Sequence, residues 1–163
     1  MGYLNPIMKF GFEAFCQKCV ECGIDGVIIP DLPFKDYEET YKPIADRYDI
    51  RVIMLITPET SEARVREIDE HTDGFIYMVS SAATTGAQKD FDSQKQAYFK
   101  KIQDMHLRNP RMVGFGISNK QTFDAACANS SGAIIGSRFV TLLNEAEGDA
   151  EKAITQLKEG LKK

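Results

Sequence analysis

Two glycine-bearing stretches decide the fold: GFGIS at residues 114–118 and GAIIGSRFV at residues 132–140. Each is a short apolar run that ends in a bare backbone, and one helix-length stretch separates them. The second stretch leads directly into a helical pattern. Glycine lets a phosphate group approach the main chain closely, and free N–H groups at a helix N-terminus attract its negative charge. The two stretches therefore predict a phosphate site like the one that follows the last two strands of a (β/α)₈ barrel.

The rest of the chain alternates short β-branched runs with helix-length amphipathic stretches, which is typical of βα units around a parallel sheet. We expect five complete strands, at residues 27–30, 52–56, 75–79, 112–115 and 133–135. Residues 1–4 have the pattern of the end of a sixth. A full barrel has eight units in about 250 residues. The 163 residues therefore predict a single α/β domain, a partial TIM (β/α)₈ barrel of about five complete βα units with parallel strands.

Polar and glycine residues between the strands predict where helices begin and end. Asp36, Thr60 and Ser118 are the expected N-caps, since their side-chain oxygens can accept hydrogen bonds from the first turn of a helix. Gly23 and Gly132 follow helical stretches, where a left-handed residue is commonly needed.

Charge and hydropathy exclude several classes of function. The net charge is −4 and the pI is about 5.3, with Lys and Arg scattered among acidic residues. This pattern argues against a nucleic-acid footprint or a basic membrane surface. No apolar run approaches the roughly 20 residues of a membrane span, and no charged segment leads into an apolar signal core. We therefore expect a cytoplasmic protein.

Three of the four cysteines, Cys16, Cys19 and Cys22, have the spacing of an iron–sulfur run whose fourth cysteine is missing. The alternative is a helix, because Phe12, Cys19 and Cys22 recur at helical spacing and an unbroken helix spreads its thiols apart. Cys127 stands alone in another expected helix. We favour buried or half-buried helix thiols, with no disulfide framework and no metal site.

Taken together, six stretches resemble one family, the tryptophan synthase alpha chain, which is a (β/α)₈ barrel. They are MGYLNPI at 1–7, DGVIIPDLP at 25–33, TPET at 57–60, GFIYMVSSAATTGA at 74–87, GFGIS and GAIIGSRFV. PDLP or GFGIS alone would be a weak signal. Their shared order and spacing along the whole chain make a chance similarity implausible.

The resemblance implies a reaction and a partner. Members of the family cleave indole-3-glycerol phosphate to indole and glyceraldehyde 3-phosphate, and pass indole to a beta chain that uses pyridoxal phosphate. This retro-aldol cleavage needs an acid and a base. In the family these are a glutamate and an aspartate upstream of the MGYLNPI stretch, and the LExGxPxxDP-type signature of the glutamate has no counterpart in the 163 residues. We therefore assign no catalytic residue and no cofactor to this chain, and expect it to be inactive alone.

The resemblance also implies which residues bind the substrate phosphate. A single glycine is usually explained by a turn or by tight packing, but two glycines at consecutive strand ends favour an anion site. The implied phosphate-binding residues are Thr85, Gly86, Phe115, Gly116, Gly136 and Ser137.

An apolar pocket for the indole ring is implied as well. The matching positions are Tyr3, Ile28, Pro30, Leu55 and Tyr77, together with Phe115. Read without the family, most of them are barrel core, because alternate strand residues fill a barrel interior. For Tyr77 the pocket and the barrel core are equally good interpretations, since its hydroxyl needs a partner if it is buried.

Contact with a beta chain is implied at Asn5, Asp31 and Pro33, which lie at or just beyond strand ends. The alternative is turn chemistry, since Asn-Pro and Asp-x-Pro both favour tight loops. We assign no role to His71 and His106, which precede strands at the expected bottom of the barrel.

Two other functions stay open at this point. A partial barrel has exposed strand edges, which template pairing with other chains, so the chain could be a non-catalytic module that forms a homodimer. It could also be another phosphate-binding barrel enzyme, such as a phosphosugar isomerase, although the combined NPI, PDLP and SSAATTGA signals argue against this.

Overall fold

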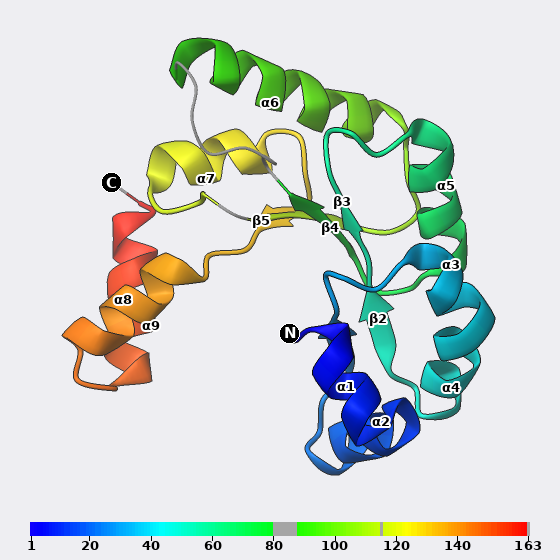
Figure 1. The fold of residues 1–163 in the computed structure, drawn as a ribbon. Coiled ribbons are helices and arrows are strands. Elements are labelled where there is room, and N and C mark those ends of the chain that lie inside the picture. The colour runs from blue at the N-terminus through cyan, green and yellow to red at the C-terminus, as the bar shows by residue number, and fades with distance from the viewer. Residues whose placement is uncertain (80–87, 115, 163) are drawn as a thin grey trace. The chain divides into compact units, whose positions relative to one another are not determined.

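A computed structural model describes residues 1–79, 88–114 and 116–162 (Figure 1). The chain divides into two compact units, which are described separately. Unit 1 comprises Met1–Tyr77 and Leu107–Pro110, and unit 2 comprises Met78–His106 and Arg111–Lys163. The boundary falls within strand β4 (Ile76–Val79).

Unit 1 holds the first three strands. Its elements are α1 (Leu4–Phe10), α2 (Phe12–Glu21), β1 (Gly26–Ile28), α3 (Phe34–Asp36), the π-helix η1 (Tyr37–Tyr41), α4 (Lys42–Arg47), β2 (Arg51–Ile53), β3 (Leu55–Ile56) and α5 (Glu62–His71), followed by the start of β4. Unit 2 continues with the end of β4 and then α6 (Gln88–Asp104), β5 (Arg111–Gly114), α7 (Lys120–Cys127), β6 (Gly132–Ala133), α8 (Ser137–Glu145) and α9 (Ala150–Gly160).

The strands form two sheets. In the first, β1 and β2 run parallel, with Ile28 opposite Ile53. The second has the order β3-β4-β5-β6, and β5 and β6 run parallel, with Val113 opposite Ala133. Strands thus form in all five expected ranges, and the range 52–56 is split at Met54 into β2 and β3.

The expected strand end at residues 1–4 is wrong. The backbone N–H of Gly2 donates to the carbonyl of Ile28 over 3.0 Å, as a neighbouring strand would. No strand follows, because helix α1 already begins at Leu4. Pro6 lies in the first turn of this helix, where its missing N–H costs no hydrogen bond.

Most strand side chains of unit 1 are buried. Val52, Ile53 and Ile56 are each at most 5% exposed, whereas Ile28 and Leu55 are only half-buried. Successive strand residues point to opposite faces of a sheet. Burial of the neighbours Val52 and Ile53 therefore means that both faces of β2 are covered.

The expected N-caps are wrong by one residue or more. Ser61, not Thr60, caps α5 and accepts from the N–H of Arg64, while the Thr60 hydroxyl accepts from the N–H of Thr57 instead. Asn119, not Ser118, caps α7 in a capping box with Thr122.

Asp36 is not an N-cap at all. It ends α3 with helical backbone angles, and its side chain makes no capping hydrogen bond to η1. The backbone continues directly into the π-helix, so no helix start exists here for a side chain to cap. The π-helix places Tyr37 in the core, and the ring of Tyr41 packs on Phe12 with centroids 4.7 Å apart.

Two glycines show different reasons for lacking a side chain. Gly23 has φ 68°, which confirms the expected left-handed residue after α2. Gly132 does not adopt this conformation and instead starts β6, so that expectation is wrong. A Cβ atom on Gly132 would lie 2.9 Å from Cε of Met112 on the neighbouring strand. A side chain at Gly132 would therefore displace the flexible end of the Met112 side chain, so this position is closely packed.

The cysteine-bearing segment is helix α2, as expected. Cys16 and Cys19 are buried, Cys22 is exposed, and all three thiols are free. Burial, with smaller contributions from Cys19 and Glu13, raises the pKa of Cys16 to about 11. Among the described residues, no cluster of three or more His, Cys, Asp or Glu side chains is arranged to hold a metal ion.

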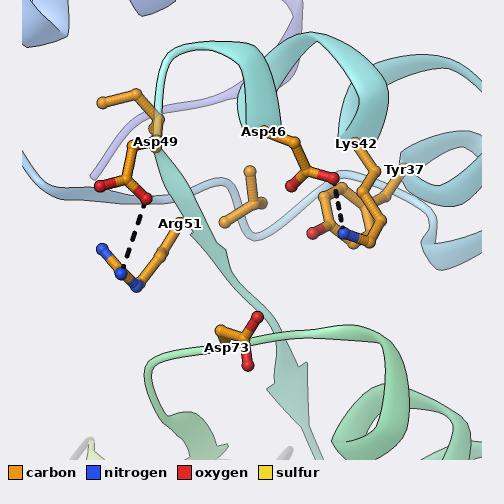
Figure 2. Close-up of a pocket in the computed structure, with 8 residues that line it drawn as sticks. Tyr37, Lys42, Asp46, Asp49, Arg51 and Asp73 are labelled. Atoms are coloured by element: carbon orange, nitrogen blue, oxygen red, sulfur yellow. Dashed lines mark hydrogen bonds and ion pairs between the residues drawn. The ribbon is translucent and has the colours of Figure 1, made fainter.

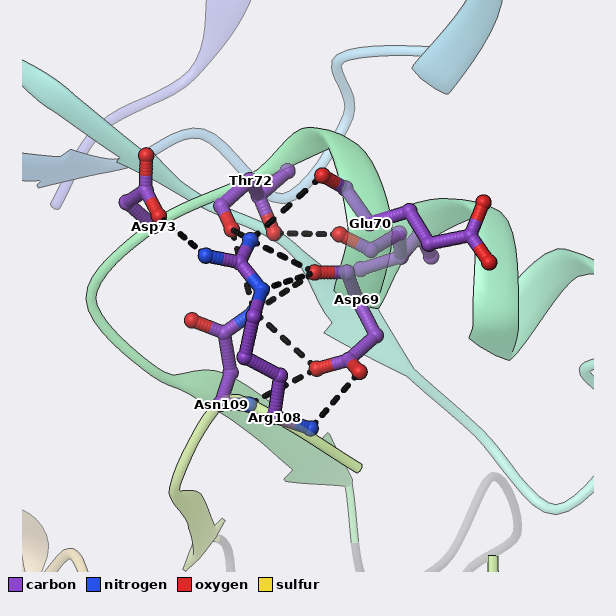
Figure 3. Close-up of polar contacts among 7 residues, drawn as sticks. Asp69, Glu70, Thr72, Asp73, Arg108 and Asn109 are labelled. Atoms are coloured by element: carbon purple, nitrogen blue, oxygen red, sulfur yellow. Dashed lines mark hydrogen bonds and ion pairs between the residues drawn. The ribbon is translucent and has the colours of Figure 1, made fainter. Parts of the chain in front are cut away.

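A buried polar cluster holds the segment before β5 against the end of α5 (Figure 3). The Asp69 carboxylate accepts from the backbone N–H groups of Arg108 and Asn109, over 2.7 and 2.8 Å. Arg108 Nη2 and Asn109 Nδ2 donate to the carbonyl of Thr72, over 2.7 and 3.0 Å. These side chains satisfy helix-end carbonyls that would otherwise lack partners. We call Asp69, Thr72, Arg108 and Asn109 the Asp69 cluster.

Candidate functional site

The predicted phosphate site begins where two neighbouring strands of unit 2 end. Gly116 follows β5, and Gly136 and Ser137 follow β6. The two strands are parallel and hydrogen-bonded, and the N–H of Ile134 extends the pairing by donating to the carbonyl of Val113 over 2.8 Å. Because parallel strands end at the same edge of a sheet, the sequence-predicted Gly116, Gly136 and Ser137 lie on one edge.

The two glycines differ in what their backbone requires. Gly116 has φ 74°, a conformation that favours glycine, so a turn alone explains it. Gly136 has φ −96°, which any residue adopts, and an added Cβ would meet nothing within 4 Å. Neither backbone strain nor close packing requires glycine at Gly136. The bare backbone there leaves open space in front of helix α8.

Helix α8 begins at this open position. Gly136 is its N-cap residue, and no side chain caps the helix. The first N–H groups of a helix have no partner within the helix and attract anions. Leu142 of α8 and Ala146, its C-cap residue, pack with Ala153 of α9 in a small buried core, which fixes the direction of α8. This end of the helix therefore has open space in front of N–H groups that no side chain caps.

The remaining predicted phosphate residues, Thr85, Gly86 and Phe115, lie outside the described residues.

Apart from Phe115, which lies outside the described residues, the residues predicted for an indole pocket belong to unit 1. Ile28 and Leu55 are half-buried in their strands, and Pro30 is half-buried two residues beyond Ile28. These three side chains present apolar surface where a small apolar ligand could bind. Tyr3 is placed differently, since 68% of its surface is exposed.

Tyr77 is buried in strand β4, and its backbone N–H donates to the carbonyl of Met54 over 2.9 Å. Burial raises the pKa of its hydroxyl, so the phenol stays neutral at physiological pH. A neutral buried phenol can orient a polar group of a ligand or of a neighbouring side chain.

The residues predicted for partner contact lie near one another in unit 1. Asn5 is exposed on α1, and the backbone N–H of the preceding Leu4 donates to Asp31 Oδ1 over 2.9 Å. Asp31 and Pro33 are exposed in the segment between β1 and α3. The turn interpretation holds for Asp31, where Leu32 N–H donates back to Ile29 over 3.1 Å, but not for Asn5, which is helical.

His71, to which the sequence assigned no role, has a structural contact. Its ring stacks on Phe34 with centroids 6.3 Å apart, and Nδ1 pairs with Glu38 Oε1. The Arg64 guanidinium lies over Phe34, 4.9 Å from the ring centroid. His106 adopts φ 51° in the turn after α6.

Sequence reasoning missed two features of unit 1. One is the Asp69 cluster, whose Asp69 and Asn109 are 40 residues apart and carry no recognisable motif. The other is a cavity of about 250 Å³ (Figure 2). It is lined by Tyr37, Lys42, Asp46, Asp49, Ile50, Arg51, Val52 and Asp73. The charged residues around Asp46 have the pattern of an ordinary solvated helix face, so the sequence does not indicate the cavity.

None of the helices in the described part of the chain combines the length and apolar character that crossing a membrane requires.

Comparison with known proteins identifies the family. The family model described as "Tryptophan synthase alpha chain" matches residues 1–163, which is the whole chain. The chain belongs to the tryptophan synthase alpha chain family. The curated tryptophan synthase alpha chain of Bacteroides fragilis is 80% identical over 158 residues, 97% of this chain and 60% of that protein. That of Bacteroides thetaiotaomicron is 79% identical over 162 residues, 99% of this chain and 63% of that protein.

Solved structures of the tryptophan synthase alpha family share the fold. The A-subunit from Pyrococcus furiosus is 28% identical and superposes with a TM-score of 0.80, over 98% of this chain and 63% of that one. The alpha chain from Legionella pneumophila gives the same identity and TM-score, over 99% of this chain and 61% of that one. The predicted fold class, a partial (β/α)₈ barrel with parallel strands, is confirmed. The chain spans about three fifths of the length of these relatives.

Proposed function

We propose that this chain contributes the phosphate-binding edge and part of the indole pocket to the alpha reaction, the cleavage of indole-3-glycerol phosphate to indole and glyceraldehyde 3-phosphate. One observation carries the proposal. Gly136 is bare although neither its backbone angles nor its neighbours require glycine, and it stands at the uncapped start of α8. A phosphate group bound there would accept hydrogen bonds from the first N–H groups of α8.

The chemistry divides into binding and proton transfer. In the cleavage, the bond between indole C3 and the glycerol chain breaks, an acid protonates C3, and a base takes the proton of the glycerol hydroxyl that becomes the aldehyde. Phosphate contacts at Gly116, Gly136 and Ser137 would hold the substrate, with Thr85, Gly86 and Phe115 beside them. Ile28, Pro30, Leu55 and Tyr77 would surround the ring, with Tyr3 at its edge. We assign no proton transfer to these residues, so the 163-residue chain alone binds without turnover.

The proposal includes a partner and a location. A solved tryptophan synthase complex from Pyrococcus furiosus contains a chain that is 26% identical to this one, with a TM-score of 0.79. Asn5, Asp31 and Pro33 are exposed and close together in unit 1, as contacts with a beta chain would require. Pyridoxal phosphate would belong to that beta chain, and the assembly would be cytoplasmic.

The decisive experiment replaces Gly136 with Asp or with Asn. Both residues cap helices well, so both variants should fold at least as stably as the parent chain. Only Asp places a negative charge where the phosphate would bind. We expect Gly136→Asp to weaken binding of indolepropanol phosphate, measured by calorimetry, by about tenfold or more relative to Gly136→Asn. Equal affinities for the two variants would contradict the phosphate site.

Activity is tested separately from binding. The 163-residue chain should release no indole from indole-3-glycerol phosphate. A fusion of the N-terminal part of the Bacteroides fragilis relative to Met1 should release it. Saturable indole release by the 163-residue chain alone would refute the proposed division of labour. Glycerol 3-phosphate as a competitor tests the alternative of a general sugar-phosphate enzyme, since it should bind more weakly than indolepropanol phosphate.

A second candidate is self-association into a homodimer through open strand edges. It is favoured by the large apolar side chains that the described structure leaves exposed near the start of unit 1. They are Met1, Tyr3, Met8, Phe10, Val20 and Ile24. Exposed apolar patches and strand edges promote pairing between chains. Sedimentation velocity should show a dimer at micromolar concentration, and a strictly monomeric species would exclude it.

A further inference from the structure

Arg138 is a positively charged residue in the first turn of α8, two residues after the N-cap Gly136. This placement is unfavourable by itself, because the N-terminal end of a helix carries a partial positive charge that repels cations. The first turn contains no acidic residue, and no side chain caps the helix. The start of α8 therefore combines an arginine with N–H groups that have no partner within the helix.

Helices α4 and α7 also have a cation in the first turn, but there an acidic side chain compensates the charge. Lys42 of α4 donates to Asp46 Oδ2 over 2.8 Å, and Lys120 of α7 donates to Asp124 Oδ2 over 2.5 Å. In both helices the aspartate lies four residues further along, on the same face. The corresponding position of α8 is Leu142, which is buried in the core shared with α9. The charge at the start of α8 is therefore not compensated in this way.

The partner that Arg138 does have is a weak one. Its Nη1 lies 3.8 Å from Glu145 Oε1, which is too long for a hydrogen bond, and both side chains are exposed. No hydrogen bond joins the guanidinium to another described residue. Glu145 is seven residues along the chain, or about 10 Å of helix rise, whereas the start of the helix is only about 3 Å away. Exposed pairs contribute little to stability, so the arginine can exchange Glu145 for another anion at small cost.

We propose that Arg138 binds the phosphate group of the substrate, an inference that rests on the phosphate site proposed above. In a helix the bond from Cα to Cβ points toward the N-terminus, so the side chain of Arg138 can extend back over Gly136. A Cβ added to Gly136 would meet nothing within 4 Å, which leaves this path open. The guanidinium presents two parallel N–H donors, which match two oxygens of a phosphate. A bound phosphate would also offset the unfavourable position of the arginine.

The test measures binding of indolepropanol phosphate to the 163-residue chain by calorimetry, in a buffer free of phosphate and at fixed ionic strength. Arg138→Gln removes the charge from an exposed side chain, and we expect it to weaken binding by about tenfold. Arg138→Lys keeps the charge but not the paired donors, so its affinity should be intermediate. Arg47→Gln is the matched control. It removes the same charge from an exposed arginine of unit 1, which pairs with Glu13, and should bind like the parent chain.

A variant of Glu145 separates a binding role from a structural one. Glu145→Gln removes the carboxylate that competes for the arginine, so we expect it to tighten binding by about twofold or more. If Arg138 served only its pair with Glu145, Arg138→Gln and Glu145→Gln would lower the thermal stability alike and neither would change the affinity. That result would overturn the proposal.

The outcomes distinguish the role of Arg138 from the phosphate site itself. No binding of indolepropanol phosphate by the parent chain would contradict both. Binding by the parent chain with an equal affinity of Arg138→Gln would overturn the role of Arg138 alone, and the comparison of Gly136→Asp with Gly136→Asn would still test the site. An equal loss of affinity in Arg138→Gln and in the control Arg47→Gln would also overturn it, because the effect would then come from net charge.

Discussion

The Asp69 cluster and the start of helix α8 differ in whether side chains hydrogen-bond to the backbone groups at the helix end. At the Asp69 cluster, the Asp69 carboxylate accepts from the backbone of Arg108 and Asn109, and the side chains of those two residues donate back to the end of α5. Asp69, Thr72 and Asn109 are buried. At Gly136, no side chain caps the helix and the space in front of it is open. A closed polar cluster contributes to stability, whereas an open one is available to a ligand.

Removing the carboxylate of Asp69 should lower the free energy of unfolding more than any other substitution considered. Asp69→Ala leaves two backbone N–H groups without an acceptor in a buried environment. We expect the free energy of unfolding to fall by about 3 kcal/mol or more. Urea denaturation measures it. Asp73→Ala is the control, since that exposed side chain pairs with Arg108 at the surface and should cost at most about 1 kcal/mol. Similar losses for both variants would show that the cluster is not the stabilising unit.

Burial of the Cys16 thiol should make the free energy of unfolding depend on pH. The pKa of Cys16 is raised to about 11 by burial, so the folded state keeps this proton at a pH where the unfolded chain loses it. Stability should therefore be complete below about pH 9 and decline by about 2 kcal/mol as the pH rises to about 11. Thermal unfolding across this range tests it. Cys16→Ala should flatten the decline and the exposed Cys22→Ser should not; an unchanged slope in Cys16→Ala would exclude Cys16 as its source.

The two glycines of the open edge should respond differently to a methyl group. Gly116→Ala places a side chain on a backbone with φ 74°, and we expect a loss of about 1 kcal/mol in the free energy of unfolding. Gly160→Ala, at the end of α9 with open space around it, is the matched control and should be neutral or slightly stabilising. No loss in Gly116→Ala would mean that the turn relaxes without a left-handed residue.

The smallest change in stability is expected at Gly136 itself. Gly136→Ala gives up a modestly favourable N-cap but restricts the unfolded chain, so the two effects should cancel to within about 0.5 kcal/mol. Thermal unfolding measures this balance. A loss of more than about 1 kcal/mol would show that Gly136 has a structural role, and the contrast with the Asp69 cluster would then fail.

Sequence reasoning succeeded where the signal was local. Apolar β-branched runs predicted all five strand ranges, because burial on both faces leaves an unbroken apolar pattern. Helix starts were less certain, since Thr60 and Ser61 offer adjacent hydroxyls and only the backbone angles decide which one caps α5. The strand end expected at residues 1–4 does not form, because Gly2 makes a single strand-like hydrogen bond to Ile28 before α1 begins at Leu4.

The candidate site was predictable only in part. Gly136 and Ser137 follow from a strand that runs into a helix, and the structure places them beside the end of β5 as expected. The structure alone shows that Gly136 is open whereas Gly132 is packed against Met112, since both are simply glycines in the sequence. The contacts between Asp69 and Asn109 join residues that are too far apart in the sequence for any local pattern to reveal.

The π-helix at Tyr37–Tyr41 marks a place where related chains can differ in length by one residue. A π turn accommodates one residue more than an α turn over the same rise. A relative one residue shorter between Phe34 and Lys42 could close the same stretch with ordinary α-helical turns and keep both flanking helices in place. Single-residue gaps between family members should therefore gather here, and they would alter the position of Tyr37 while leaving strands β1 and β2 untouched.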